Sequence, residues 1–230
     1  MEDGSTEYKT PRTTLKRRPD RGSYDFESVR KVLDETFLCH VGITVDDTPF
    51  VLPTSFGRDG RDLLIHGSSA SGLLRKISTS IPMCVTVTHF DGLVLARSIF
   101  AHSMNYRSAV MFGQATRLEG DEKYAALAKM SDYMIPGRWD ESRLPTDQEM
   151  KGTSIVRFVI EEASVKVRSG PPLDEDEDLP FPAWAGVLPM TTAIGYPIDD
   201  PRAPEAREVP DYVTDWAGAR RAFIARGGAD

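Results

Sequence analysis

The fold is decided by residues 38–67, which read LCHVGITVDDTPFVLPTSFGRDGRDLLIHG. The run Leu38–Val45 is apolar and rich in β-branched residues, which favour strands. Residues 46–49, DDTP, predict a turn, and Phe50–Phe56 reads as the returning strand. Asp59-Gly60 is typical of a tight hairpin turn, and an apolar third strand follows it. Consecutive strands joined by tight turns predict an antiparallel sheet.

Further strands follow at short intervals. Pro82–Phe90 alternates Val with Thr, and Asp91-Gly92 predicts another hairpin turn. More strands are expected at 93–101, 108–118 and 154–167. One helix is expected from a cap at Ser23 to about Thr36, and a second over residues 122–134. Parallel α/β folds place helices between most strands, whereas a closed Greek-key barrel removes exposed sheet edges. The sequence therefore predicts a mainly β, antiparallel Greek-key β-barrel with flanking helices.

The composition divides the chain into three parts. Residues 1–22 are polar and basic, and we expect a flexible arm that drapes over a partner subunit. Residues 23–170 form the barrel domain. Residues 171–230 form a C-terminal extension whose acidic run, 174–178, is expected to be solvated. Its apolar segment 184–190 is expected to pack on the barrel or on a second subunit.

The charge of the chain is unevenly distributed. The formal net charge of −7 disfavours nucleic acid as a partner. Between Leu63 and Leu118 there are five basic residues against one acid, Asp91, so this segment carries +4 and the remainder −11. Core strands exclude charges of either sign, which explains the missing acids but not the surviving bases. We interpret the excess of bases as space for an anionic ligand.

The cysteine content and the hydropathy indicate the cellular compartment of the protein. Cys39 and Cys84 cannot build a disulfide framework, so two buried thiols in a reducing compartment are expected. No run of about 18 apolar residues occurs, and the N-terminal charges are not followed by an apolar core. These features predict a cytoplasmic protein without a membrane partner.

Residues 66–76, HGSSASGLLRK, have the composition of a phosphate-binding loop. They combine hydroxyl groups, the start of a short helix and two cations, with no acid among them. An ordinary strand-to-helix loop with solvated bases explains the spacing about equally well. The segment does not have the spacing of a P-loop or a nucleophile elbow, and no dinucleotide-binding fingerprint follows a strand.

Two other segments could contact a cofactor. Residues 102–108, HSMNYRS, offer a guanidinium, an amide and hydroxyls; a polar β-turn is the simpler alternative. Pro53 cannot donate to a sheet ladder, so it marks an edge, a strand start or a bulge. A planar ring could lie against such an opened strand, although an edge strand without a ligand explains these residues as well.

Several segments, in this order, resemble one family of flavoproteins. They are FLCHVG at 37–42, PTSF at 53–56, LIHGS at 64–68, RK at 75–76 and NYRSAVMFG at 105–113. The chain resembles the pyridoxamine 5'-phosphate oxidase-like proteins, in the branch that contains nitroimidazole-reductase-like flavin-binding proteins. The resemblance runs from about Tyr24 to Val167, and WAGVLP at 184–189 resembles a C-terminal extension of that branch.

The resemblance implies a six-stranded split barrel that forms a homodimer with FMN at the subunit interface. By motif, the flavin ring would lie against Val51, Pro53, Thr54 and Ser55. The residues that lead toward the phosphate would be His66, Gly67, Ser68, Ser71, Arg75 and Lys76. From the next strand, the cofactor would be approached by Arg107 and Ser108.

The function that follows is an FMN-dependent oxidoreductase acting on a small molecule, in which the flavin supplies the redox chemistry. His66 is the candidate catalytic residue because it ends a strand beside the proposed loop, and a structural histidine is an equal alternative. Residues 219–223, ARRAF, lack the Arg- and His-containing signature of pyridoxine-phosphate oxidases, so that substrate is not expected.

Two other functions remain open. One is a module that binds flavin or haem without efficient turnover, which nothing in the sequence excludes. The other is a metal-dependent hydrolase, but the chain has no C-x-x-C or H-x-x-x-H pair. Cys39 and His40 are adjacent on a strand and point to opposite faces. No metal site is therefore expected.

Overall fold

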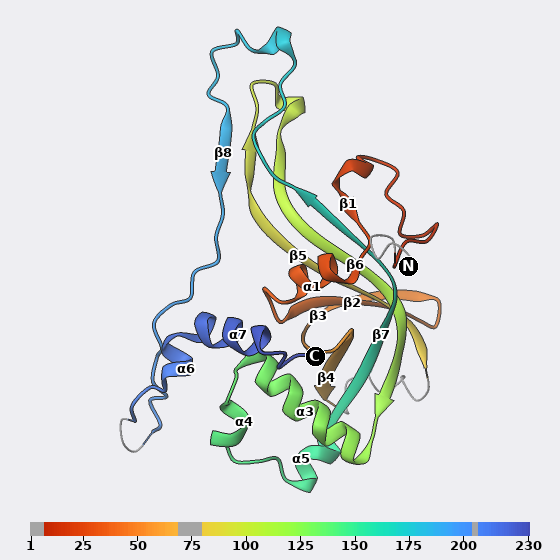
Figure 1. Ribbon diagram of the computed structural model, residues 1–230, viewed down its shortest axis with the longest axis vertical. Coiled ribbons are helices and arrows are strands. Elements are labelled where there is room, and N and C mark those ends of the chain that lie inside the picture. Colours follow the sequence, from red (N-terminus) through yellow and green to blue (C-terminus); the bar gives the residue numbers. More distant parts are fainter. Residues whose placement is uncertain (1–6, 69–79, 204–206) are drawn as a thin grey trace. The chain divides into compact units, whose positions relative to one another are not determined.

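The computed structural model describes residues 7–68, 80–203 and 207–230, and its dominant feature is one sheet (Figure 1). The strands are β1 (Gly22–Ser23), β2 (Leu38–Val45), β3 (Thr48–Asp59), β4 (Asp62–Ser68), β5 (Ile81–Leu95), β6 (Ser103–Leu118), β7 (Thr153–Arg168) and β8 (Gly186–Pro189). Their order is β1-β7-β4-β3-β2-β5-β6, with β7 also pairing with β6 and β8 with β5. Strands β7, β4, β3, β2, β5 and β6 pair in this order, and β6 pairs in turn with β7, so these six strands form a closed ring of pairings. The sheet has eight strands where six were expected, because β1 and β8 pair with strands of that ring.

The chain clusters into two compact units. Unit 1 comprises residues 1–35, 85–111 and 162–193. Unit 2 comprises residues 36–84, 112–161 and 194–230. Strands β5, β6 and β7 contribute residues to both units, so neither unit is a continuous stretch of sequence.

The β2–β3 hairpin forms where the sequence predicts it. Its register runs from Leu38 opposite Ser55 to Val45 opposite Thr48, antiparallel throughout. The turn residues Asp46 and Asp47 have φ of 48° and 59°. Positive φ at both central positions is the conformation of a type I′ turn, whose twist matches that of hairpin strands. Aspartate tolerates this region better than most residues, so the local sequence fixes the hairpin.

The second predicted hairpin turn, at Asp91-Gly92, is wrong. Strand β5 continues through both residues to Leu95. Gly92 pairs with Pro189 of β8, and a Cβ on Gly92 would lie 2.7 Å from the Leu188 carbonyl oxygen. The glycine therefore allows β8 to approach closely instead of reversing the chain. As a consequence, residues 105–108 lie within β6 and not in a loop between strands.

Helices lie before β2, between β6 and β7, and at the C-terminal end of the chain. They are α1 (Phe26–Leu33), α3 (Gly120–Met134), α4 (Arg138–Glu141), α5 (Asp147–Gly152), α6 (Asp211–Thr214) and α7 (Trp216–Ala225). The cap of α1 is Asp25, whose carboxylate accepts from the Ser28 N–H at 2.8 Å; the expected cap, Ser23, lies in β1. Within the described residues, no helix has the length and apolar character needed to cross a membrane.

The described part of the N-terminal segment packs on unit 1 and is not a free arm. Tyr8 is buried, its N–H donates to the Tyr24 carbonyl, and its own carbonyl accepts from the Ala163 N–H. The Thr10 hydroxyl bonds the Glu162 carboxylate. These contacts tie residues 7–22 to this chain's own β7.

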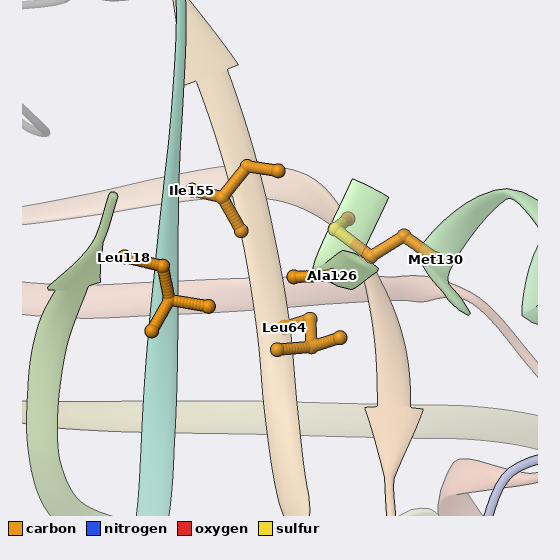
Figure 2. Close-up of a cluster of buried hydrophobic side chains, with 5 residues drawn as sticks. All are labelled: Leu64, Leu118, Ala126, Met130 and Ile155. Carbon is orange, nitrogen blue, oxygen red and sulfur yellow. The ribbon is translucent and has the colours of Figure 1, made fainter. Parts of the chain in front are cut away.

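The core of unit 2 lies between α3 and the sheet (Figure 2). Its buried side chains are Leu64, Leu118, Ala126, Met130 and Ile155. A Cβ on Gly57 of β3 would meet the Met130 Cα at 2.8 Å, so α3 approaches the strand directly. Burying each large side chain of this kind contributes about 1.5–3 kcal/mol, which anchors α3 on β3 and β4.

The end of the C-terminal extension packs on unit 2. The Trp216 indole N–H donates to the Met134 carbonyl at 2.7 Å. Buried Arg220 donates to the carbonyls of Tyr133 at 3.0 Å and Thr36 at 2.8 Å, and its guanidinium lies 4.5 Å from the Tyr133 ring centroid. Helix α7 is therefore held against α3 by its own chain.

Candidate functional site

The β2–β3 ribbon presents one face that carries three of the predicted ring contacts. Because side chains alternate along a strand, Val51, Pro53 and Ser55 point to the same side. Their cross-strand partners are Gly42, His40 and Leu38. Val51 is 67% exposed and Leu38 52% exposed, so this face offers apolar surface to a ligand or a partner.

The fourth predicted ring contact lies elsewhere. Thr54 pairs with Cys39, which is fully buried, so its side chain points to the opposite face of the ribbon. Burial raises the pKa of the Cys39 thiol to about 12, so this cysteine stays protonated at neutral pH. Cys84 is half-buried and forms no disulfide within the described part of the chain.

Two buried polar atoms lie near the end of β4, on opposite faces of the sheet. His66 pairs with Ile155 and Gly67 with Ser154 on β7. The His66 Nδ1 and the Ser154 Oγ are both buried and have no hydrogen-bond partner among the described residues. Leaving such atoms unsatisfied costs about 1–3 kcal/mol each, so each of them marks a separate position where a ligand group could bind. Ser154 escaped the sequence analysis because it is an isolated serine at the start of an apolar strand.

A cleft of about 350 Å³ opens beside His66 within unit 2. Its walls include Met130, Met134, Trp139 and Arg143. The Arg143 guanidinium binds the Glu149 carboxylate at 2.7 Å and 3.0 Å, which lowers the pKa of Glu149 to about 2. Clefts of roughly 300–1,000 Å³ accommodate small molecules. His66 thus lies where a substrate could reach it.

The predicted phosphate cradle is only partly within the described structure. Ser71, Arg75 and Lys76 lie outside the described residues. The backbone of Ser68 is the last of β4 and pairs with Thr153. Strand β4 therefore leads directly from His66 into the segment that carries the predicted cradle, which stays a prediction.

Arg107 and Ser108 belong to unit 1, and Arg107 is already neutralised there. Its guanidinium donates to both Asp91 carboxylate oxygens, at 2.8 Å and 3.0 Å, and also bonds Glu35. These bonds lower the pKa of Asp91 and raise that of Arg107. The Ser108 hydroxyl donates to the Lys166 carbonyl at 3.4 Å. The fold therefore brings two carboxylates to Arg107, neither of them from its own segment 102–108.

Unit 1 contains a larger cleft of about 700 Å³ that the sequence analysis did not identify. It lies where residues 17–21, a 3₁₀ turn at Ile99–Ala101, the start of β6 and the end of β7 meet. Its cations are Arg17, Arg18, Arg21, Lys166 and Arg168. Among the residues that the structure describes, no group of three or more His, Cys, Asp and Glu side chains is placed to hold a metal ion.

Comparisons with known proteins agree with this fold. The family model for pyridoxamine 5'-phosphate oxidase matches residues 25–167. The flavocytochrome Anf3 from Azotobacter vinelandii is 39% identical, with a TM-score of 0.83, over 89% of this chain and 95% of that chain. An FAD- and haem-binding protein from Mycobacterium smegmatis is 37% identical, with a TM-score of 0.80, over 84% of this chain and 95% of that chain.

A more distant structure is that of a candidate 5-nitroimidazole antibiotic resistance protein from Bacteroides thetaiotaomicron. It is 21% identical, with a TM-score of 0.48, over 64% of this chain and 87% of that chain. No curated protein matches the chain. The family model and the two structures above 35% identity confirm the resemblance found in the sequence, and the chain belongs to the pyridoxamine 5'-phosphate oxidase family.

Proposed function

We propose that this protein binds a flavin and a haem and transfers electrons between a small-molecule donor and an acceptor. The observation that carries the proposal is the similarity, over 84–89% of this chain, to a flavocytochrome and to an FAD- and haem-binding protein. A bound flavin exchanges two electrons or one, and a bound haem exchanges one, so the pair suits an electron-transfer protein. The protein's own part is to hold both groups and to tune their surroundings.

The residues of unit 2 fit a flavin. Val51, Pro53 and Ser55 form an apolar face with one hydroxyl, which suits a planar ring with polar edges. The unpartnered His66 Nδ1 and Ser154 Oγ lie on opposite faces of the sheet, so each can supply a hydrogen bond to a different part of the bound molecules. His66 would then act in binding or in proton transfer near the flavin.

The nucleotide is proposed to be FAD. The resemblance seen in the sequence implied FMN, but the M. smegmatis protein that covers 84% of this chain binds FAD. Mass spectrometry of the flavin released from denatured protein decides between the two. FMN as the sole released flavin would restore the expectation from the sequence.

A homodimer is proposed because unit 2 leaves apolar strand residues uncovered. Leu38 and Val51, on the same face of the β2–β3 ribbon, are 52% and 67% exposed. A second copy that covers this face would bury them and enclose a cofactor bound there. Light scattering should give twice the chain mass; a monomer that holds flavin would contradict an interfacial site.

The absorbance spectrum of the purified or reconstituted protein tests the function. We expect two broad flavin bands together with a sharp Soret band, and bleaching of the flavin bands when NADH or NADPH is added without oxygen. Flavin without haem after hemin is added would leave a flavoprotein of the same family. Failure to bind either group would contradict the proposal.

Ser154→Ala tests the flavin site because it should change protein stability and flavin affinity in opposite directions. Removing an unsatisfied buried hydroxyl should raise the stability of the flavin-free protein by about 1 kcal/mol and weaken flavin binding about 3- to 10-fold. Urea unfolding and flavin titration measure the two effects. Ser164→Ala, a buried serine on the same strand but in unit 1, is the matched control and should not change flavin affinity. Lower stability with unchanged flavin affinity would show that Ser154 is purely structural.

A further inference from the structure

The cleft of unit 1 carries an excess of positive charge. Arg18 pairs with Asp20 at 2.9 Å, but Arg17, Arg21 and Arg168 have no carboxylate partner among the described residues. Burial, and repulsion from Arg21 and Arg18, lower the pKa of Arg168. Glu175 and Asp178 also line the cleft and offset only part of this charge. An anion would relieve the repulsion among these cations.

The same cleft exposes large apolar side chains. Phe100 is 97% exposed, Leu173 60% and Met104 46%. Each such side chain left in water forgoes the stabilisation that its burial would give. A ligand that fits this cleft therefore has both a broad apolar body and negative groups. The volume of about 700 Å³ is within the range of cofactor sites.

His102 supplies a metal ligand in a fixed tautomer. Its Nδ1 lies 2.9 Å from the Ser98 carbonyl oxygen. A carbonyl only accepts hydrogen bonds, so Nδ1 carries the proton and Nε2 of the neutral ring keeps its lone pair. Nε2 has no partner within the described part of the chain. Metal-binding histidines commonly have their second nitrogen bonded in this way to a carbonyl or carboxylate.

The Ser98 carbonyl is itself held in place. Asp174 accepts from the backbone N–H of Arg97 at 2.7 Å and of Ser98 at 3.4 Å, and from the Arg97 guanidinium at 3.0 Å. The Asp174 side chain is 3% exposed, so this residue of the acidic run is not solvated as the sequence suggested. Asp174 therefore fixes the turn that orients His102.

We propose that this cleft is the haem site, with the His102 Nε2 as an iron ligand. The macrocycle would lie against Phe100 and Met104, and the propionates would pair with Arg17, Arg21 and neighbouring cations. Asp174 is a positioning residue, because it acts on the iron only through Ser98 and His102. This inference rests on the proposed function and assigns its haem to residues of unit 1.

Hemin titration of the full chain, followed by its Soret band, tests the ligand. His102→Ala should weaken hemin binding about 100-fold or more, since loss of even an outer partner of a metal ligand costs 10- to 100-fold. His89→Gln is the matched control in unit 1, because its Nε2 contacts the Val32 carbonyl at 2.8 Å and is not free for iron. Imidazole added to His102→Gly should restore the histidine-ligated spectrum, which a purely structural role would not produce.

A second measurement tests the propionates. Arg17→Gln combined with Arg21→Gln should weaken hemin binding 10-fold or more while leaving the dimethyl ester of hemin almost unaffected, because the ester has no charge to pair. Equal losses of affinity for hemin and for its dimethyl ester would show that Arg17 and Arg21 do not pair with the propionates. Arg12→Gln, from the same N-terminal segment, is the control, because Arg12 pairs with Glu162 at 3.7 Å outside the cleft lining.

The outcomes separate this inference from the function on which it rests. A wild-type protein that binds flavin but no hemin contradicts the haem part of the proposed function, and the inference falls with it. A wild type that binds hemin, with His102→Ala binding equally well, overturns only the assignment to this cleft. Loss of the Soret band in His66→Ala, with normal binding by His102→Ala, would overturn it in the same way.

Discussion

Arg107 and Arg168 are two arginines of unit 1 whose guanidinium groups bond partners of different charge. Arg107, on β6, is bound by the carboxylates of Asp91 and Glu35, so its charge is cancelled. Among the described residues, Arg168 at the end of β7 bonds only neutral acceptors: the Asn105 amide oxygen and the carbonyls of Gly170 and Pro171. Its charge therefore adds to that of the other cations of the cleft that it lines. Whether an arginine is available to a ligand depends on which carboxylates the fold brings to it.

The largest effect is expected from Arg168→Ala. Arg168 is 5% exposed, and its removal leaves the buried Asn105 amide oxygen and the Pro171 carbonyl without this donor, while the Gly170 carbonyl keeps only the bond from the Asn105 amide nitrogen. We expect a loss of about 3 kcal/mol in the free energy of unfolding, measured in urea. Arg107→Ala, the comparison variant, should cost only about 1 kcal/mol because its ion pairs are partly exposed. Equal losses would mean that the neutral acceptors around Arg168 are satisfied in another way.

Asp91→Asn tests the ion pair that neutralises Arg107. We expect it to lower the free energy of unfolding by about 1 kcal/mol at pH 7. The bonds from Arg107 hold the pKa of Asp91 below its ordinary value. The ionised carboxylate therefore stabilises the fold above the usual aspartate pKa of about 4, and this contribution disappears as the pH falls through the lower folded value. Urea unfolding at pH 7, 5 and 3 should show the wild type and the variant converging at the acid end.

The control for Asp91→Asn is the neutral substitution of its partner, Arg107→Gln. Combining the two substitutions should cost less than the two separate losses added together, because each variant removes the same ion pair. A stability difference that does not shrink at all between pH 7 and pH 3 would show that packing, and not the charge of Asp91, holds the two strands together.

The sequence predicted best where local chemistry decides the structure. Strand β2 was predicted at its observed bounds, Leu38–Val45, because its β-branched residues and the turn after it agree. Two Asp-Gly pairs carry the same local signal, yet Asp59-Gly60 turns the chain and Asp91-Gly92 does not. The difference comes from β8, which pairs with β5 from about 95 residues downstream. No short-range pattern contains that information.

The candidate sites show the same division. Val51, Pro53 and His66 came from motifs within single strands. The cleft of unit 1 escaped prediction because it is assembled from residues 17–21, 98–106 and 166–178, which are far apart in the sequence. The carboxylates that neutralise Arg107 likewise come from other segments. A count of charges along the chain finds the bases but does not show which of them remain unpaired.

The smallest change in stability is expected from Arg21→Gln. In the ligand-free protein Arg21 has no carboxylate partner among the described residues and raises the energy of its neighbour Arg168. Its removal should leave stability unchanged or raise it by about 0.3–0.5 kcal/mol, and salt should erase the difference by screening. Arg12→Gln should instead lower stability slightly, because Arg12 pairs with Glu162. Urea unfolding at low and high salt compares the two variants. If Arg21→Gln lost stability as Arg12→Gln does, Arg21 would be compensated within the protein, and the cations of the cleft would be no more available to an anionic ligand than Arg107.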